Sequence, residues 1–281
     1  MSLLIRKQGL LDTIQDAGRY GYQHLGINTS GAMDSTAMKT GNALVGNSLD
    51  EPVLEMHFPA AEIEFEMAAL IAITGADCTA EINGEVLPMF HPVMIQKGSV
   101  LRFRKNQTGA RVYLAISGGY ISSTWLNSNS TNLKVKAGGY QGRALQKNDR
   151  LLLTLNEYDF FHFNDKSFIA LPWSANLSGF YTAATIQFIP GAEYHYLNSV
   201  SAKRFENISF TILPQSDRMG YRLKGESLVL QLPREMISSA VTKGTIQLLP
   251  DGQLIILLAD HQTSGGYPKI GHVISSHIAS L

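Results

Sequence analysis

The chain has 281 residues, of which 44% are hydrophobic and 16% are charged, an ordinary balance for a globular protein of one or two domains. Lysine plus arginine and aspartate plus glutamate number 23 each, so the formal net charge of +0 argues against nucleic acid or an anionic membrane as a partner. No apolar run approaches the roughly 18 residues that a membrane helix needs, and Arg6 and Lys7 come too early for a secretory leader. These two observations predict a soluble, unprocessed protein. The single cysteine, Cys78, cannot form an intrachain disulfide, which predicts the reducing cytoplasm as its location.

Strand-like segments dominate the chain, and the Gly, Asn, Asp and Pro residues between them favour an all-β barrel or sandwich over alternating βα units. The expected strands are 3–7, 62–67, 70–74, 79–82, 93–96, 100–104, 111–116, 150–155, 185–189, 209–213 and 253–258. Asn83-Gly84 and Asp251-Gly252 predict tight hairpin turns.

Two helices are expected. The first covers residues 33–45, with Asp34 or Ser30 as its cap, and the second covers 270–280. Residues 156–166 are polar and aromatic without clear periodicity, so they are the candidate linker between domains 1–160 and 161–281.

The run from Asp16 to Arg19 joins a carboxylate and a guanidinium through a short Ala-Gly turn. Arginine offers a planar fork for a carboxylate or phosphate, and the aspartate can orient a donor, so this loop is a candidate anion site. A turn that holds only its own internal ion pair is the alternative that the same residues allow.

Residues 216–222 bring Asp217, Arg218 and Arg222 together after an expected strand, a composition suited to a small anionic substrate or a phosphoryl group. The two arginines are four residues apart, so either a helical turn or a strand would place them on one face. A solvated loop at the edge of a sheet is the competing interpretation.

Gln247 and the block 260–268 offer carboxylate, imidazole, amide and hydroxyl groups beside the apolar strand 253–258. Asp260 and Gln262 follow that strand at once, which is typical of a pocket rim. A well-hydrogen-bonded hairpin corner explains the same pattern equally well.

No two histidines occur as H-x-x-x-H or H-E-x-x-H, and a single cysteine offers no thiolate pair, so a metal site is not expected. The chain also lacks a G-x-x-x-x-G-K-[ST] loop and a G-x-S-x-G elbow. If ATP is used, this chain does not bind it through a P-loop.

Colinear blocks from residue 9 to about residue 275 resemble the family that includes the C subunit of 5-oxoprolinase, allophanate hydrolase subunit 2 and the Kip antagonist. The blocks are 13–22, 52–55, 73–77, 113–119, 138–143, 216–223, 244–247 and 260–268. The resemblance implies a mainly β fold of two cyclophilin-like β-barrel domains with few short helices, the first of which carries the Asp16 and Arg19 loop.

The resemblance also implies a function: the C subunit of a 5-oxoprolinase, which cleaves 5-oxoproline to L-glutamate coupled to ATP hydrolysis. The expected partners are an A-type subunit and a B-type subunit similar to allophanate hydrolase subunit 1, and the chain alone should be inactive. The expected catalytic residues are Asp16, Arg19, Asp34, Asp217 and Asp260. The expected substrate-binding residues are Arg143, Arg218, Arg222, Gln247 and Gln262, with no metal.

Two alternatives remain within the resemblance. One is the carboxyltransferase subunit of a biotin-dependent urea or amide carboxylase, with biotin on another polypeptide. The other is a non-catalytic, Kip antagonist-like regulator of a kinase inhibitor. Neighbouring genes would discriminate among the three, because each function needs a different partner.

The chain departs from the family pattern in four places, one of which is 238–241, where it lacks the acidic residue that relatives often have. It reads Asn-Ser-Asn-Ser-Thr at 127–131, where relatives typically have Gly-Ser-Arg-Ser-Thr, and it has His261 where arginine is more usual. It also ends at Leu281, before a closing strand that the resemblance leads us to expect. A partner is therefore expected to cover a sheet edge at that end.

Overall fold

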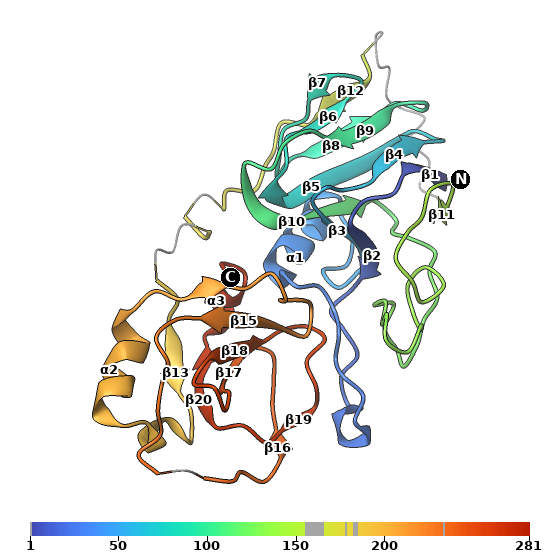
Figure 1. The fold of residues 1–281 in the computed structure, drawn as a ribbon. Helices are drawn as coiled ribbons and strands as arrows, with labels where there is room; N and C mark the ends of the chain where they lie inside the picture. The colour runs from blue at the N-terminus through green and yellow to red at the C-terminus, as the bar shows by residue number, and fades with distance from the viewer. Residues whose placement is uncertain (1, 155–165, 178, 182–184, 233) are drawn as a thin grey trace. The chain divides into compact units, whose positions relative to one another are not determined.

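The computed structural model describes residues 2–154, 166–177, 179–181, 185–232 and 234–281 (Figure 1). Its internal contacts divide the chain into two compact units: unit 1 is Met1–Arg19 with Asp34–Leu177, and unit 2 is Tyr20–Met33 with Ser178–Leu281. The units are therefore not two consecutive halves, since an N-terminal segment belongs to unit 2. The expected boundary at residue 160 and the expected linker 156–166, apart from Lys166, lie outside the described residues.

Unit 1 contains two antiparallel six-stranded sheets, ordered β11-β1-β4-β9-β6-β7 and β12-β8-β5-β10-β3-β2. The strands of the first sheet are β1 (Ser2–Lys7), β4 (Glu62–Phe65), β6 (Ala80–Ile82), β7 (Glu85–Val86), β9 (Val100–Phe103) and β11 (Arg150–Leu152). Those of the second are β2 (Leu11–Gln15), β3 (Val53–His57), β5 (Ala69–Asp77), β8 (Pro92–Ile95), β10 (Thr108–Ile116) and β12 (Phe168–Ala170).

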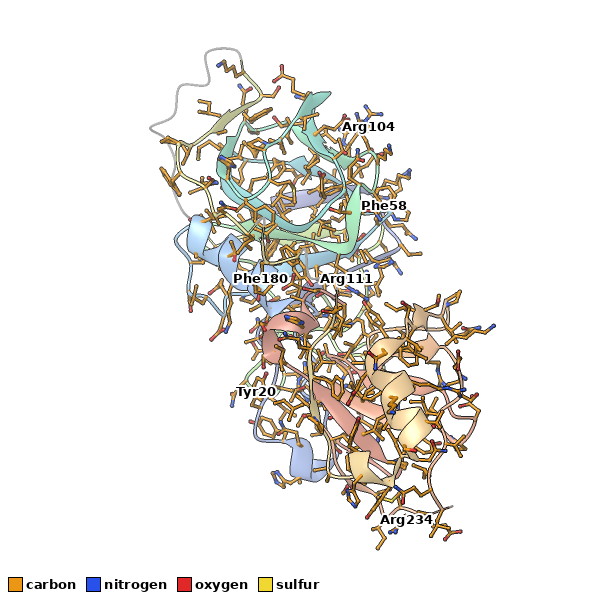
Figure 2. All side chains as sticks on the ribbon, turned by 90° about the vertical axis from the view of Figure 1, so that its left-hand side faces the viewer. Tyr20, Phe58, Arg104, Arg111, Phe180 and Arg234 are labelled. Atoms are coloured by element: carbon orange, nitrogen blue, oxygen red, sulfur yellow. The ribbon has the colours of Figure 1, made fainter. Side chains whose placement is uncertain are left out.

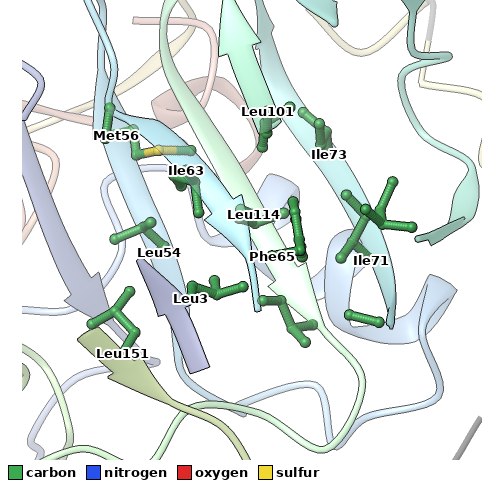
Figure 3. Close-up of a cluster of buried hydrophobic side chains, with 14 of the residues drawn as sticks. Leu3, Leu54, Met56, Ile63, Phe65, Ile71, Ile73, Leu101, Leu114 and Leu151 are labelled. Carbon is green, nitrogen blue, oxygen red and sulfur yellow. The ribbon is translucent and has the colours of Figure 1, made fainter. Parts of the chain in front are cut away.

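The core of unit 1 is formed by apolar side chains that strands of both sheets contribute. Leu3 of β1 and Phe65 of β4 come from the first sheet, and Leu54, Ile71 and Leu114 come from the second (Figure 3). Each is almost completely buried, and burying such a side chain stabilises the fold by roughly 1.5–3 kcal/mol. Successive side chains of a strand point to opposite faces of the sheet, so these apolar residues all point from their strands into the core.

Helix α1 (Ser35–Leu44) packs on the second sheet of unit 1. The Asp34 carboxylate caps its start by accepting hydrogen bonds from the backbone N–H groups of Thr36 and Ala37, both at 2.9 Å. Gly41 faces the sheet, where a Cβ would lie 3.1 Å from Cβ of Ala115, so a small residue permits the close approach.

Unit 2 contains one antiparallel six-stranded sheet, ordered β13-β20-β17-β18-β15-β14, and a two-stranded ribbon, β16-β19. The sheet strands are β13 (Phe188–Pro190), β14 (Thr211–Ile212), β15 (Gly220–Lys224), β17 (Thr245–Leu248), β18 (Leu254–Leu257) and β20 (Lys269–Val273). The remaining elements are β16 (Ser239–Ala240), β19 (Ser264–Gly265), α2 (Ser199–Asn207), α3 (Ser275–Ile278) and the short 3-10 helices η1 (Gln23–Leu25) and η2 (Tyr194–Tyr196).

The expectation of a mainly β fold is confirmed, and the described strands pair as open sheets rather than closing into rings. The turn at Asn83-Gly84 is also confirmed, with positive φ values of 52° and 94° at its two residues. The expected helix 270–280 is wrong. Residues Lys269–Val273 form β20, because the backbone of β17 pairs with this segment, and only Ser275–Ile278 are helical.

No helix in the described part of the chain is long and apolar enough to cross a membrane. Within the same described residues, no group of three or more His, Cys, Asp or Glu side chains is arranged to hold a metal ion.

Candidate functional site

A cavity of about 490 Å³ opens in unit 2 against β15, β17 and β18. All of its lining residues belong to that unit: Gln215, Asp217, Met219, Gly220, Arg222, Gln247, Leu249, Pro250, Asp251, Ile255, Gln262 and Tyr267. Four of the ten residues that the sequence singles out are therefore brought together here, namely Asp217, Arg222, Gln247 and Gln262.

Strand register explains this convergence. Ile255 of β18 pairs with Arg222 of β15 on one side and with Gln247 of β17 on the other, so the three side chains form a row across the sheet. Cross-strand partners project from the same face. Their neighbours Tyr221 and Ile246 project from the opposite face into the apolar core. The strands thus present an apolar face to the core and this row to the cavity.

Gln247 stands at the buried end of the row. Its side chain is 0% exposed, yet neither Oε1 nor Nε2 has a hydrogen-bond partner among the described residues. Gly265 of the β16-β19 ribbon lies directly against it, and a Cβ at that position would collide with Nε2 of Gln247. The ribbon therefore keeps water from the amide on one side, and the cavity borders it on the other.

Arg222 stands at the exposed end of the row. Two other surface arginines form ion pairs with carboxylates. Arg104, which Figure 2 labels, pairs with Glu81 at 2.7 Å, and Arg6 pairs with Glu64 at 2.7 Å. By contrast, the guanidinium of Arg222 makes no hydrogen bond or ion pair with any described residue. The cavity thus has a cation whose fork is open to an anionic ligand.

The two carboxylates of the cavity wall, Asp217 and Asp251, accept hydrogen bonds from backbone N–H groups of the turns that contain them. Oδ1 of Asp217 accepts hydrogen bonds from the backbone N–H of Met219 at 2.8 Å and of Gly220 at 3.3 Å. Oδ1 of Asp251 accepts from the backbone N–H of Gln253 at 3.0 Å. These bonds shape the loops on either side of the row and leave Oδ2 of each aspartate without a hydrogen bond to a described residue.

Arg218 and Asp260 lie outside the cavity lining and hold each other. Nε of Arg218 donates to Oδ2 of Asp260 at 2.8 Å, and Nη2 donates to Oδ1 at 3.4 Å and to the carbonyl of Gly31 at 2.6 Å. Ser30 and Asn28 add hydrogen bonds to Asp260, at 2.7 Å to its carboxylate and 3.1 Å to its carbonyl. This pair fastens the segment Tyr20–Met33 to the rest of unit 2.

Asp16 is the centre of a hydrogen-bonded loop in unit 1. Its carboxylate accepts from the backbone N–H groups of Gly18 at 2.8 Å and Asn129 at 2.5 Å, and from the hydroxyls of Ser128 at 2.7 Å and Ser130 at 2.5 Å. Four donors converge on one buried carboxylate. The segment that departs from the family pattern thus supplies three of its partners.

The other three predicted residues also have partners nearby in unit 1. Arg19 is buried, donates to the carbonyl of Ser130 at 2.5 Å and lies over the ring of Trp125, with Cζ 4.8 Å from the centroid. Arg143 makes a two-point pair with Asp149, at 2.7 and 2.8 Å. Asp34 caps α1. The structure therefore leaves the fork of Arg143 occupied and gives Asp34 a local role.

Burial shifts two titratable groups near these clusters. The pKa of Asp12 on β2 is raised to about 7, chiefly because the carboxyl is buried. Burial also lowers the pKa of His261, whose Nδ1 donates to the carbonyl of Gln262 at 2.6 Å. His261 is therefore neutral near pH 7, at the position where the resemblance leads us to expect a fixed cation.

Sequence reasoning missed Tyr267, Asp251 and Gln215 as parts of the cavity wall. Tyr267 lies in the block 260–268, and the local sequence indicates Asp251 only as half of a hairpin turn. The signal that would have found them is the register of β15, β18 and β17. Two of those strands are not expected from the sequence.

The family described as carboxyltransferase domain, subdomain A and B, matches residues 25–281. The chain is 34% identical to the 5-oxoprolinase C subunit of Escherichia coli over 282 aligned residues, which cover 99% of this chain and 87% of that one. It is also 34% identical to the 5-oxoprolinase C subunit of Haemophilus influenzae, covering 96% and 83% of the two chains. A urea amidolyase of Saccharomyces cerevisiae is 37% identical over 150 residues, covering 53% of this chain and 8% of that protein.

Solved structures show the same fold. A crystal structure of the protein TTHA0988 superposes with a TM-score of 0.82 at 28% identity over 99% of this chain, which spans about half (52%) of that longer chain. The urea amidolyase of K. lactis superposes with a TM-score of 0.87 at 25% identity, covering 99% of this chain and 18% of that one.

Proposed function

The chain belongs to the carboxyltransferase domain, subdomain A and B, family, and we propose that it is the C subunit of a 5-oxoprolinase. In this proposal it opens the lactam of 5-oxoproline to L-glutamate, coupled to ATP hydrolysis, together with A-type and B-type partner subunits. Its near full-length similarity to two subunits of that name supports the proposal. The observation that carries it within the molecule is the cavity of unit 2 with the open guanidinium of Arg222.

The groups of the cavity suit a small anionic amide. A guanidinium fork binds a carboxylate at two points, and the aspartates on the wall are placed to orient donors. A lactam is a stable amide, so its opening needs the carbonyl oxygen to be polarised or phosphorylated by preorganised groups. We assign Arg222 to the substrate carboxylate and Asp217 to the orientation of the reacting group.

ATP belongs to the assembled complex in this proposal. The chain has no P-loop sequence, so nucleotide binding falls to another subunit or to a surface that the subunits share. We also place the protein in the cytoplasm, where a single buried thiol such as Cys78 stays reduced.

Reconstitution with the two partner subunits tests the proposal. The complex should hydrolyse ATP in a 5-oxoproline-dependent manner and release glutamate, while the chain alone should not. An Arg222→Gln variant should lower kcat/KM at least about tenfold, or about 1.4 kcal/mol. Lys224→Gln is the matched control, because Lys224 lies on the same strand outside the cavity lining. Equal activity of Arg222→Gln and wild type, or of a complex without this chain, would refute the proposal.

A carboxyltransferase subunit is the second candidate, favoured by the fold shared with K. lactis urea amidolyase. In that case the substrate would be urea or another amide, and biotin would be carried on another polypeptide. Copurification separates the two functions, since one predicts lactam-dependent ATP hydrolysis and the other predicts carboxylation that depends on a biotinylated partner.

A further inference from the structure

The amide of Gln247 is the polar group in the cavity whose environment is hardest to explain by folding alone. It is completely buried, and both Oε1 and Nε2 lack a hydrogen-bond partner among the described residues. An unpaired buried amide is unfavourable to stability. A ligand that pairs with both atoms would remove that penalty.

The shape of a primary amide limits which ligand can do so. The carbonyl oxygen and one N–H of Gln247 point along a single edge, so the complementary partner also has a C=O and an N–H on one edge. Small cyclic amides and ureides have this arrangement, because the ring holds their amide bond in the cis form. An open-chain secondary amide is trans, and its two groups point in opposite directions.

The rest of the row defines the other end of the ligand. Arg222 lies two strands away from Gln247, which places the two backbones about 10 Å apart at ordinary strand spacing. Ile255 lies between them and offers an apolar surface. A ligand that fits this row has an amide edge at one end, a short apolar ring in the middle and an anionic group at the other end.

We propose that the cavity of unit 2 binds a small cyclic amide that carries a carboxylate, with Gln247 paired to the cis-amide edge and Arg222 to the carboxylate. The choice of 5-oxoproline as this ligand rests on the proposed function. The ureido ring of biotin and urea itself offer the same amide edge, so both are measured as alternative ligands in addition to 5-oxoproline and its three probes.

Binding is measured by calorimetry on the full chain, alone and in the reconstituted complex, with 5-oxoproline and three probes that each lack one feature or more. Proline lacks the carbonyl, 2-pyrrolidone lacks the carboxylate, and N-methyl-2-pyrrolidone lacks both the carboxylate and the N–H. We expect 5-oxoproline to bind at least about tenfold more tightly than proline, and 2-pyrrolidone to bind more tightly than its N-methyl derivative.

Two variants assign the ends of the ligand. Gln247→Met keeps the length of the side chain and removes its polar atoms, so it should weaken 5-oxoproline and 2-pyrrolidone at least about tenfold each. Arg222→Gln should weaken 5-oxoproline by a similar factor and leave 2-pyrrolidone unchanged. Lys224→Gln should change neither affinity.

Thermal stability separates binding from a structural role. Because Gln247→Met removes unpaired buried polar atoms, its ligand-free Tm should rise, by roughly 2 °C or more. A lower Tm with unchanged affinities would overturn the inference, and so would the absence of binding by every probe. If urea or biotin binds in place of 5-oxoproline and depends on Gln247, the inference stands and the proposed lactam function fails. If the complex turns over 5-oxoproline normally with Gln247→Met, the function stands and the inference fails.

Discussion

The Asp16 loop of unit 1 and the cavity of unit 2 both consist of polar residues that stand out in the sequence. They differ in whether the polar groups have hydrogen-bond partners within the protein. Four donors converge on the Asp16 carboxylate. In the cavity, the amide of Gln247 meets no donor or acceptor among the described residues, and the guanidinium of Arg222 meets no acceptor. A satisfied cluster stabilises a loop, whereas an unsatisfied one is available to a ligand.

The side chains of Arg218 and Asp260 are hydrogen-bonded to each other, as the groups of the Asp16 loop are to their partners, although both residues lie close to cavity-lining residues in the sequence. The fork of Arg218 is occupied by a carboxylate and by the carbonyl of Gly31. The contrast between Arg218 and Arg222 therefore lies within one short segment, which makes it the most direct place to test the distinction.

Asp12 of unit 1 should give the largest effect on the free energy of unfolding. Its carboxyl group is buried, incompletely hydrogen-bonded and outside the described cavity. It is 1% exposed, Oδ2 accepts from the backbone N–H of Gly9 at 2.8 Å, and Oδ1 has no partner among the described residues. Burial raises its pKa to about 7, so the folded protein holds a proton that the unfolded chain releases above pH 4. Its stabilising contribution is complete below about pH 4 and is lost as the pH rises through about 7.

We expect Asp12→Asn to unfold less readily than wild type at pH 8.5, by on the order of 4 kcal/mol, and to lose that advantage at pH 4. Denaturant unfolding at several pH values measures the difference. If the difference in the free energy of unfolding between the two proteins does not depend on pH, Asp12 is ionised in the folded state. Asp12 would then not be an example of an unsatisfied buried group.

Asp16→Asn should have the next largest effect. It replaces a carboxylate oxygen by an N–H group that faces donors, and we expect a loss of about 3 kcal/mol in the free energy of unfolding. Asp217→Asn is the control, because that carboxylate holds only a turn, so its loss should stay below about 1 kcal/mol. Comparable losses in the two variants would contradict the assignment of Asp16 to a stabilising role.

The two arginines of residues 216–222 should respond differently to lysine. If Arg218 bound substrate, as expected from the sequence, Arg218→Lys would lower activity and spare stability. The geometry predicts instead a stability loss of about 2 kcal/mol, because lysine cannot reproduce the two-point pair with Asp260. Arg222→Lys should leave the free energy of unfolding within about 0.5 kcal/mol and lower the affinity for 5-oxoproline. If Arg222→Lys lowers the free energy of unfolding and Arg218→Lys does not, Arg222 has the stabilising role and the assignment of the two arginines is wrong.

Much of the fold could be predicted from local sequence, because strands such as β1 and β5 carry strong apolar patterns and Asn83-Gly84 fixes its own turn. Strands β15 and β17 are short, so the alternation of Arg222 and Gln247 with apolar neighbours covers only four or five residues and gives a weak local signal. The apolar spacing of Lys269–Val273 fits the period of a helix as well as that of a strand, and pairing with β17 decides in favour of a strand.

The sequence predicts which residue types form the site, but it does not predict which of these residues come together in space. Spacing could not separate Arg218 from Arg222, because the partner Asp260 is 42 residues away and meets only one of them. Likewise, nothing local to Gln247 reveals that Gly265 covers it. Such distinctions depend on register between distant strands, which no single segment encodes.

A small effect on stability is also expected at Gly265, where a substitution tests whether the position of the Gln247 amide matters for ligand binding. An added Cβ would collide with Nε2, but this atom ends a flexible side chain, so Gly265→Ala should change the free energy of unfolding by less than about 1 kcal/mol. The displaced amide would no longer face the cavity at the same angle. We therefore expect affinity for 5-oxoproline to fall about tenfold, or about 1.4 kcal/mol. Gly266→Ala is the control in the same ribbon, because a Cβ there would approach Ser238 at 3.2 Å and does not meet Gln247. If Gly265→Ala binds 5-oxoproline as wild type does, the position of this amide is not what makes the cavity of unit 2 differ from the Asp16 loop.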